Sequence, residues 1–168
     1  MLNNGHNWSV WLLPGTKDKK ECKGYIKFYS GLYNTPLFDP HVTLFGRLKI
    51  DPEPTYVFFN QLRSELNIEK VNNINIQTGE SPWKTIHIKL DSNKYLVRLQ
   101  RKIAEYFAKY REYRFEPHIS LAYGNFIPDK KDLNLLSIKK RISFTSLAIM
   151  HTPDQIKNWR LIKKFDFC

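Results

Sequence analysis

Two hydrophobic periods alternate along the chain, one typical of strands and the other of helices. Short apolar or alternating segments bounded by Pro, Gly or Asn predict strands. These segments are residues 7–13, 40–48, 70–77, 84–90, 115–123, 141–150 and 156–166. In three other segments apolar residues recur every three or four positions, which predicts amphipathic helices. These begin near Thr16, Asp51 and Asn93 and end near Asn34, Leu66 and Tyr110.

The order of these elements indicates the fold class. Helices lie between strands and hairpins, so the predicted class is α+β. No stretch rich in Ser, Gly or Pro interrupts the pattern, and a length of 168 residues suits one domain. We therefore expect residues 1–168 to form a single domain with two lobes.

Composition narrows the classes of function. With 42% hydrophobic and 14% aromatic residues, the chain is not a disordered tail. Lys and Arg number 27 against 16 Asp and Glu, which gives a net charge of +11. Such a surplus favours polyanionic partners such as RNA or nucleotides, although a basic surface can also serve solubility alone.

The sequence lacks the marks of secretion and membrane insertion. Its first apolar run, residues 10–13, is too short for a signal peptide. No run approaches the roughly 18 apolar residues of a membrane span. Cys22 and Cys168 lie too far apart in sequence to form a metal-binding pair, and two cysteines make no disulfide framework. We expect a monomeric, cytoplasmic protein that does not bind membranes.

One short segment occurs twice. Residues 38–44 read Phe-Asp-Pro-His-Val-Thr-Leu, and residues 115–121 read Phe-Glu-Pro-His-Ile-Ser-Leu. Four of the seven positions are identical, and the other three keep an acid, a β-branched aliphatic and a small hydroxyl residue. Because each copy follows an amphipathic helix, the repeat indicates two related halves.

In each copy the histidine and the hydroxyl residue share one face of a strand. Side chains alternate faces with a period of two, so His41 lies beside Thr43 and His118 lies beside Ser120. A pseudo-twofold arrangement would bring both pairs to one cleft. One imidazole can then accept a proton while the other donates one, and the hydroxyls can hold phosphoryl oxygens. Such a set can open a cyclic phosphodiester with water and needs no metal or other cofactor.

These two His-x-Thr/Ser motifs resemble those of the two-histidine (2H) phosphoesterase superfamily. Within it the chain is most similar to the cyclic phosphodiesterases of plants and yeast. The similarity includes the opening strand at residues 9–14, the extension of the second motif to Tyr123, and Trp159 before the last strand. The resemblance implies a bilobal α+β fold, in which two pseudo-twofold related antiparallel sheets face a central cleft and helices pack outside.

The resemblance also implies a reaction and a set of site residues. The substrate would be ADP-ribose 1″,2″-cyclic phosphate or a nucleoside 2′,3′-cyclic phosphate, with an RNA 2′,3′-cyclic phosphate end as the alternative. By this comparison His118 would activate water and His41 would protonate the leaving oxygen. The implied site comprises the catalytic His41 and His118, the phosphate-binding Thr43 and Ser120, and the substrate-lining Trp11, Trp83 and Tyr123.

Whether Trp83, Tyr123 and His87 reach the cleft depends on local strand geometry. Trp83 follows a Thr-Gly turn, where the family has an aromatic residue. Strict alternation places Tyr123 opposite His118, so Tyr123 reaches the cleft only if the strand bends or ends before it, as at Gly124. His87 shares the strand parity of Trp83, although a histidine in a strand is more often a structural residue.

Two other functions fit parts of the sequence. A metal site could combine the histidines with Asp39 and Glu116, which share their parity, although each acid precedes a proline at a strand start. A non-catalytic RNA-binding module could hold phosphates through basic residues. These residues are Arg98, Arg101, Lys102, Lys139, Lys140, Arg141, Lys163 and Lys164.

Overall fold

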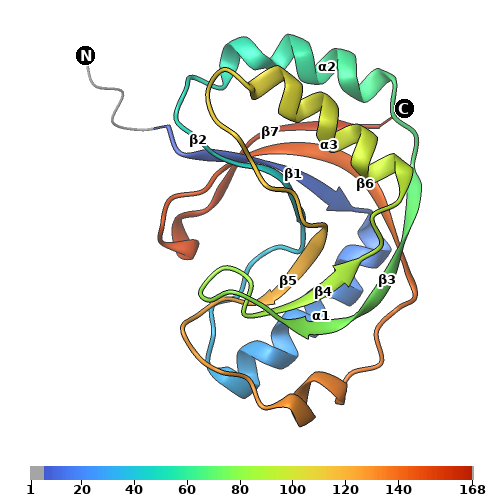
Figure 1. The fold of residues 1–168 in the computed structure, drawn as a ribbon, viewed down its shortest axis with the longest axis vertical. Coiled ribbons are helices and arrows are strands. Elements are labelled where there is room, and N and C mark those ends of the chain that lie inside the picture. Colours follow the sequence, from blue (N-terminus) through green and yellow to red (C-terminus); the bar gives the residue numbers. More distant parts are fainter. Residues whose placement is uncertain (1–5, 168) are drawn as a thin grey trace.

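The computed structural model describes residues 6–167, which form a strongly curved antiparallel sheet with α-helices packed on it (Figure 1). The strands are β1 (Trp8–Pro14), β2 (Val42–Leu48), β3 (Glu69–Thr78), β4 (Ile86–Leu90), β5 (His118–Ala122), β6 (Arg141–His151) and β7 (Arg160–Asp166). The α-helices are α1 (Thr16–Tyr33), α2 (Tyr56–Ser64) and α3 (Lys94–Phe107). Short 3₁₀ helices are η1 (Glu53–Thr55), η2 (Lys130–Asn134) and η3 (Ile156–Asn158).

The sheet consists of two equivalent halves that meet at its centre. The strand order is β2-β1-β6-β3-β4-β5, and β7 pairs with β6. The unit β1-α1-β2 beside β6 therefore corresponds to β4-α3-β5 beside β3. The first residues of β3 pair with β6 and the later ones pair with β4, so the two expected antiparallel sheets are joined through one strand. The α+β fold with pseudo-twofold halves is confirmed.

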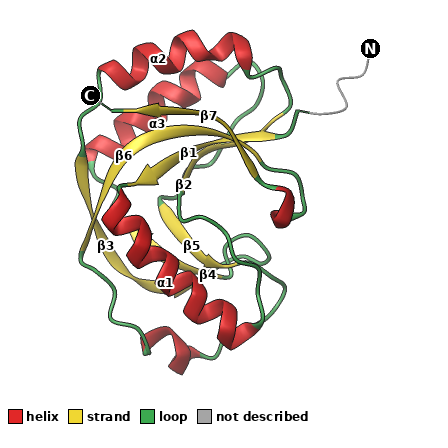
Figure 2. Ribbon diagram, turned by 180° about the vertical axis from the view of Figure 1, so that it is seen from behind, coloured by secondary structure: helices red, strands yellow, loops and turns green. Residues whose placement is uncertain are grey.

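Each long helix packs against a strand of the opposite half. Helix α1 follows β1 but contacts β5, whereas α3 follows β4 but contacts β2. Figure 2 shows α1 crossing the lower half, while α2 and α3 cover the upper strands. The buried stripe of α3 includes Leu99, Ile103 and Phe107, as its 3.6-residue period predicts. The two crossings tie the halves together.

Four strand starts lie two or more residues later than expected, and one of them is that of β4, which begins at Ile86 rather than at residue 84. β2 and β5 begin at Val42 and His118 rather than at residues 40 and 115. Pro40 and Pro117 precede these strands and have no N–H to donate to a ladder. The last strand begins at Arg160 rather than at residue 156, because residues 156–158 form η3.

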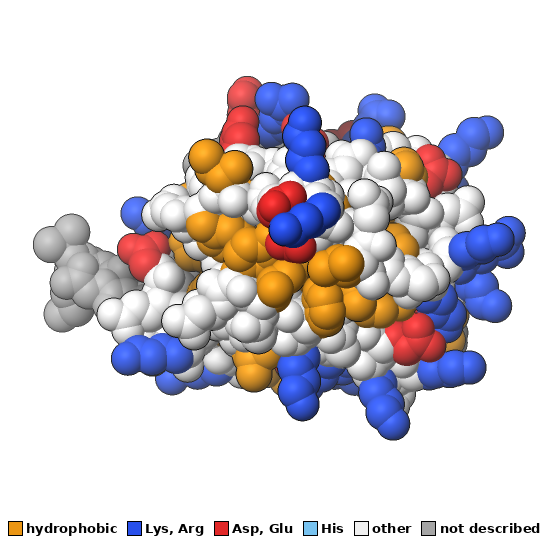
Figure 3. Space-filling model, turned by 90° about the horizontal axis from the view of Figure 1, so that it is seen from below, with side chains coloured by type: hydrophobic (Ala, Val, Ile, Leu, Met, Phe, Trp, Pro, Cys, Tyr) orange, Lys and Arg blue, Asp and Glu red, His pale blue; other side chains and the backbone are white. Residues whose placement is uncertain are grey.

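The basic residues are distributed rather than gathered in one run. On the lower face, lysine and arginine side chains surround a central group of hydrophobic ones (Figure 3). Among residues 6–167, no helix combines the length and the apolar character needed to cross a membrane. Cys22 is buried with a free thiol, and Cys168 lies outside the described residues.

A buried carboxylate joins the start of α1 to β6. Asp18 is 5% exposed, pairs with the Lys139 ammonium and accepts a 2.7 Å hydrogen bond from the Ser143 N–H. Burial alone would raise the Asp18 pKa, but the bonds from Lys139 and Ser143 outweigh it and hold the pKa below its ordinary value. Helix capping does not explain this residue, because Gly15 is the N-cap and provides no side chain.

We predict that Asp18→Ala lowers the free energy of unfolding by about 1–3 kcal/mol, since it leaves the Ser143 N–H without its acceptor. Because the folded-state pKa lies below the unfolded value of about 3.9, the wild-type contribution is complete above pH 4 and is lost as the pH falls through the folded pKa. Urea unfolding at pH 7 and at pH 3 measures both effects. If the difference in the free energy of unfolding between wild type and Asp18→Ala is as large at pH 3 as at pH 7, this assignment is wrong.

Candidate active site

The repeated segments meet at one cavity of about 510 Å³, formed by residues of both halves of the sheet. The first repeat supplies His41 and Thr43, and the second supplies His118 and Ser120. The structure also brings the three expected aromatic residues to this cavity, which are Trp11, Trp83 and Tyr123. All seven residues that the sequence predicts for the site therefore line the same space.

The two histidines are held in the same way. His41 Nδ1 lies 2.7 Å from the carbonyl oxygen of Asp39, and His118 Nδ1 lies 2.6 Å from that of Glu116. A carbonyl oxygen can only accept, so each Nδ1 carries the proton. Nε2 is then the ring nitrogen available for proton transfer, on both imidazoles.

His41 is buried and stacked on an indole. Its ring lies flat against Trp11, with centroids 3.4 Å apart and an interplanar angle of 4°. The neighbouring strands explain the contact, because Trp11 pairs with Thr43 across β1 and β2. Burial, only partly opposed by the Asp39 carbonyl and aided by a charge on His118, lowers the pKa of His41 to about 3. His41 is therefore neutral at pH 7.

His118 lies beside a third histidine. The rings of His118 and His87 are 5.3 Å apart and nearly perpendicular. Burial lowers the pKa of both, to about 4 for His87, and the charge of Lys84 adds to the effect on each. Ser120 is the cross-strand partner of His87, so the two side chains share one face of the sheet. His87 is only 3% exposed, however, and does not line the cavity.

The two hydroxyl residues differ in their surroundings. Thr43 is half-buried, whereas Ser120 is 4% exposed. The Ser120 hydroxyl donates a long hydrogen bond, 3.3 Å, to the carbonyl oxygen of Trp83. Such a weak bond can be exchanged for one to a phosphoryl oxygen at little cost.

Tyr123 reaches the cavity because strand β5 ends one residue before it. β5 stops at Ala122, and Gly124 has φ of +148°, a conformation that side-chain-bearing residues rarely adopt. The Gly124 N–H donates to the carbonyl oxygen of Pro82 at 2.9 Å, which joins this turn to the β3–β4 loop. The Tyr123 ring consequently lies 5.5 Å from that of Trp83.

The sequence did not assign Trp159 to the site. This residue directly precedes β7, and its indole N–H donates to the Pro153 carbonyl oxygen at 2.8 Å. Its ring lies 5.4 Å from that of Trp11 and 5.6 Å from that of Tyr123. The late tryptophan in the resemblance was the one signal for it, because its loop has no hydrophobic period.

Four cationic side chains around the cavity were also not predicted. They are Arg47, Lys84, Arg111 and Arg114, against the acids Glu80, Glu116 and Asp154. The Arg47 guanidinium lies 5.7 Å from the centre of the Trp83 ring, and its backbone has φ of +58°, which is unusual for arginine. These residues lie in loops and at strand ends, where neither period nor motif marks them.

The two carboxylates considered as metal ligands are occupied by cations. Asp39 pairs with Lys23 at 2.9 Å and with Lys19 at 3.4 Å. Glu116 pairs with Lys84 and, at 3.0 Å, with Arg114. Across residues 6–167 no group of three or more His, Cys, Asp and Glu side chains could hold a metal ion.

The fold and the sequence were compared with known proteins. In solved structures, TT0787 of Thermus thermophilus superposes with a TM-score of 0.73 at 12% identity, over 96% of this chain and 98% of that one. Escherichia coli LigT in complex with 3′-AMP gives 0.56 at 13% identity, and in complex with NADP⁺ 0.61 at 11%, each over 98% of this chain and 99% of LigT. At such identities the similarity concerns the fold.

Sequence comparison gives the family. No curated protein matches the chain. A family model described as "Cyclic phosphodiesterase-like protein" matches residues 7–167, nearly the whole sequence. Together with the fold and the two His-x-Thr/Ser motifs, this match shows that the chain belongs to the cyclic phosphodiesterase-like family of the 2H phosphoesterase superfamily.

Proposed function

We propose that this protein is a metal-independent cyclic phosphodiesterase that opens a ribose cyclic phosphate to a phosphomonoester. The substrates that fit are ADP-ribose 1″,2″-cyclic phosphate and nucleoside 2′,3′-cyclic phosphates. The observation that carries the proposal is the matched pair of imidazoles at one cavity, each with its Nδ1–H bonded to a carbonyl two residues earlier in the chain.

The proposed reaction uses both imidazoles. His118 Nε2 takes a proton from water as the water oxygen bonds to phosphorus. The bond from phosphorus to one ribose oxygen breaks, and His41 gives that oxygen a proton. The Thr43 and Ser120 hydroxyls donate to the non-bridging oxygens, where negative charge accumulates in the transition state.

The indole beneath His41 supports the assignment of the acid to this histidine. The face of an indole attracts a cation, so the stack with Trp11 favours an imidazolium at His41. Burial holds the His41 pKa near 3. A phosphodiester bound in the cavity brings the opposite charge, which raises that pKa and allows His41 to serve as the acid.

Charge and fold relatives both favour a nucleotide substrate. The cations Arg47, Lys84, Arg111 and Arg114 around the cavity suit an anionic ligand. Escherichia coli LigT, which shares the fold, has been solved with 3′-AMP, NADP⁺ and ATP. The family match is to cyclic phosphodiesterase-like proteins as a group, so the plant and yeast branch is part of this proposal.

A purely RNA-binding role has less support. Two of the basic residues expected to hold RNA on α3 are paired within the protein, Arg101 with Glu105 and Lys102 with Glu65. A binding surface would also not need two imidazoles with the same ring nitrogen fixed. An RNA end bearing a 2′,3′-cyclic phosphate is a substrate of the same chemistry and is considered below.

We predict that His41→Ala and His118→Ala each lower kcat/KM for a cyclic phosphate by about 10²–10⁴-fold, because each removes one proton-transfer group. Ser120→Ala and Thr43→Val lower it by roughly 10- to 100-fold through a lost hydrogen bond to the phosphate. His151→Ala, which lies outside the cavity, serves as the matched control and keeps wild-type activity. Activity that excess chelator abolishes and a divalent ion restores would contradict the metal-independent mechanism.

The two roles can be separated with a leaving group that needs no proton. For a nucleoside 3′-(4-nitrophenyl) phosphate we expect His118→Ala to lose about 10²–10⁴-fold in kcat, as with the cyclic substrate. His41→Ala should stay within about tenfold of wild type, because nitrophenolate leaves unprotonated. Release of nitrophenolate measures both, and the reverse pattern would assign the acid to His118.

An NMR titration tests the charge of His41. In the free enzyme its imidazole should titrate near pH 3, well below the ordinary value of 6.5, and remain the Nδ1–H tautomer at pH 7. Adding a nucleoside 3′-phosphate should raise that pKa, since the phosphate favours the imidazolium. The His41→Ala spectrum identifies the signal. A free-enzyme pKa close to 6.5 would show that the ring is not desolvated as described.

A further inference from the structure

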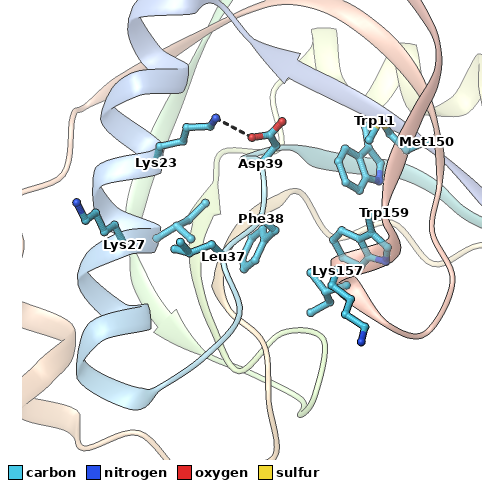
Figure 4. A pocket seen from close by; sticks show the side chains of 11 residues that line it. Trp11, Lys23, Lys27, Leu37, Phe38, Asp39, Met150, Lys157 and Trp159 are labelled. Carbon is cyan, nitrogen blue, oxygen red and sulfur yellow. Dashed lines mark ion pairs between the residues drawn. The ribbon is translucent and has the colours of Figure 1, made fainter.

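A second cavity of about 480 Å³ lies directly behind the catalytic one. It is formed between α1, the segment before β2 and the β6–β7 loop, and Figure 4 shows the side chains that line it. Its apolar walls come from Ile26, Leu37, Phe38, Met150 and Ile156, together with Trp11 and Trp159. The reaction proposed above does not use this cavity.

One layer of aromatic rings separates the two cavities. Trp11 and Trp159 line both of them. Phe38 lines only the second cavity, yet its ring lies 4.3 Å from that of Tyr123, which lines only the first. The two cavities are therefore direct neighbours that share the rings of Trp11 and Trp159 as a common wall.

The charges of the second cavity suit a phosphate beside an aromatic ring. Its ionic side chains are Lys23, Lys27, Lys157 and Asp39. Lys23 is bound to Asp39, as the dashed line in Figure 4 marks. Lys27 and Lys157 form no ion pair within residues 6–167, so the walls carry a net positive charge. Aromatic walls that bind a base by stacking and lysines that bind a phosphate are the features of a nucleotide site.

We propose that the second cavity binds a second nucleoside of the substrate, with its base against the aromatic walls and its linking phosphate in the positive field of Lys27 and Lys157, which lie at opposite ends of the cavity (Figure 4). This inference rests on the proposed function, because it assumes that the reacting ribose occupies the first cavity. Two compounds share the required chemistry. In ADP-ribose 1″,2″-cyclic phosphate a diphosphate joins adenosine to the reacting ribose, and in an RNA end a phosphodiester joins the penultimate nucleoside to it.

Three cyclic substrates test the proposal. They are a mononucleoside 2′,3′-cyclic phosphate, a dinucleotide that ends in a 2′,3′-cyclic phosphate, and ADP-ribose 1″,2″-cyclic phosphate. The double variant Lys27→Ala/Lys157→Ala should raise KM for a two-nucleoside substrate about tenfold or more. KM for the mononucleoside compound should change less than twofold. Lys20→Ala, an exposed lysine of α1 outside both cavities, is the matched control.

A second variant tests the same cavity by charge repulsion. Leu37 is 64% exposed, so Leu37→Glu leaves the core intact and adds a negative charge to the wall of the cavity that would hold the linking phosphate. It should raise KM for the same two-nucleoside substrate and spare the mononucleoside. Whichever of the two larger substrates responds identifies the natural class, an RNA end or an ADP-ribose derivative.

The outcomes distinguish this inference from the proposed function. Equal effects on all three substrates, or none on any, would overturn the second nucleoside site while leaving the catalytic mechanism intact. If wild-type protein hydrolyses none of them, the proposed function fails, and equilibrium dialysis with a 3′-phosphorylated dinucleotide decides the site alone. Weaker dinucleotide binding in the double variant, with unchanged 3′-AMP binding, would support the site; unchanged dinucleotide binding would overturn it.

Discussion

The chemistry of the site depends on one hydrogen bond that occurs twice. Each imidazole donates from Nδ1 to a carbonyl two residues earlier, across an intervening proline. These carbonyls belong to Asp39 and Glu116, whose side chains form ion pairs with lysines. These ion pairs are partly exposed, so each adds only a little to the stability of the backbone that orients the rings. In both copies of the repeat the acid before Pro-His has a lysine partner.

The position of the two histidines relative to each other depends on how the halves of the sheet are joined. Only the first part of β3, from Glu69 to Asn72, pairs with β6. The helices supplement this short ladder, since α1 packs on β5 and α3 packs on β2. Strands β2 and β5, which carry the two motifs, are therefore each supported by a helix that begins in the opposite half. A change in the core beneath α1 or α3 would be transmitted to the spacing of the imidazoles.

Much of the site could be predicted because the repeat combined residue identity with strand parity. His41, Thr43, His118 and Ser120 needed only a period of two and a symmetric fold. Tyr123 required in addition that a strand end at a glycine, which the sequence also indicated. The rest depended on contacts between segments distant in sequence. Such contacts bring the ring of His87 beside that of His118 and a cluster of cations to the rim, and no motif encodes them.

The flat stack of Trp11 on His41 has a practical consequence. Indole fluorescence is quenched when a protonated imidazole lies in contact with it, and a neutral imidazole quenches far less. The emission of Trp11 therefore responds to the charge on the neighbouring ring, without any added dye. The protein therefore contains an optical reporter of the charge on one of the two imidazoles that we propose to transfer protons.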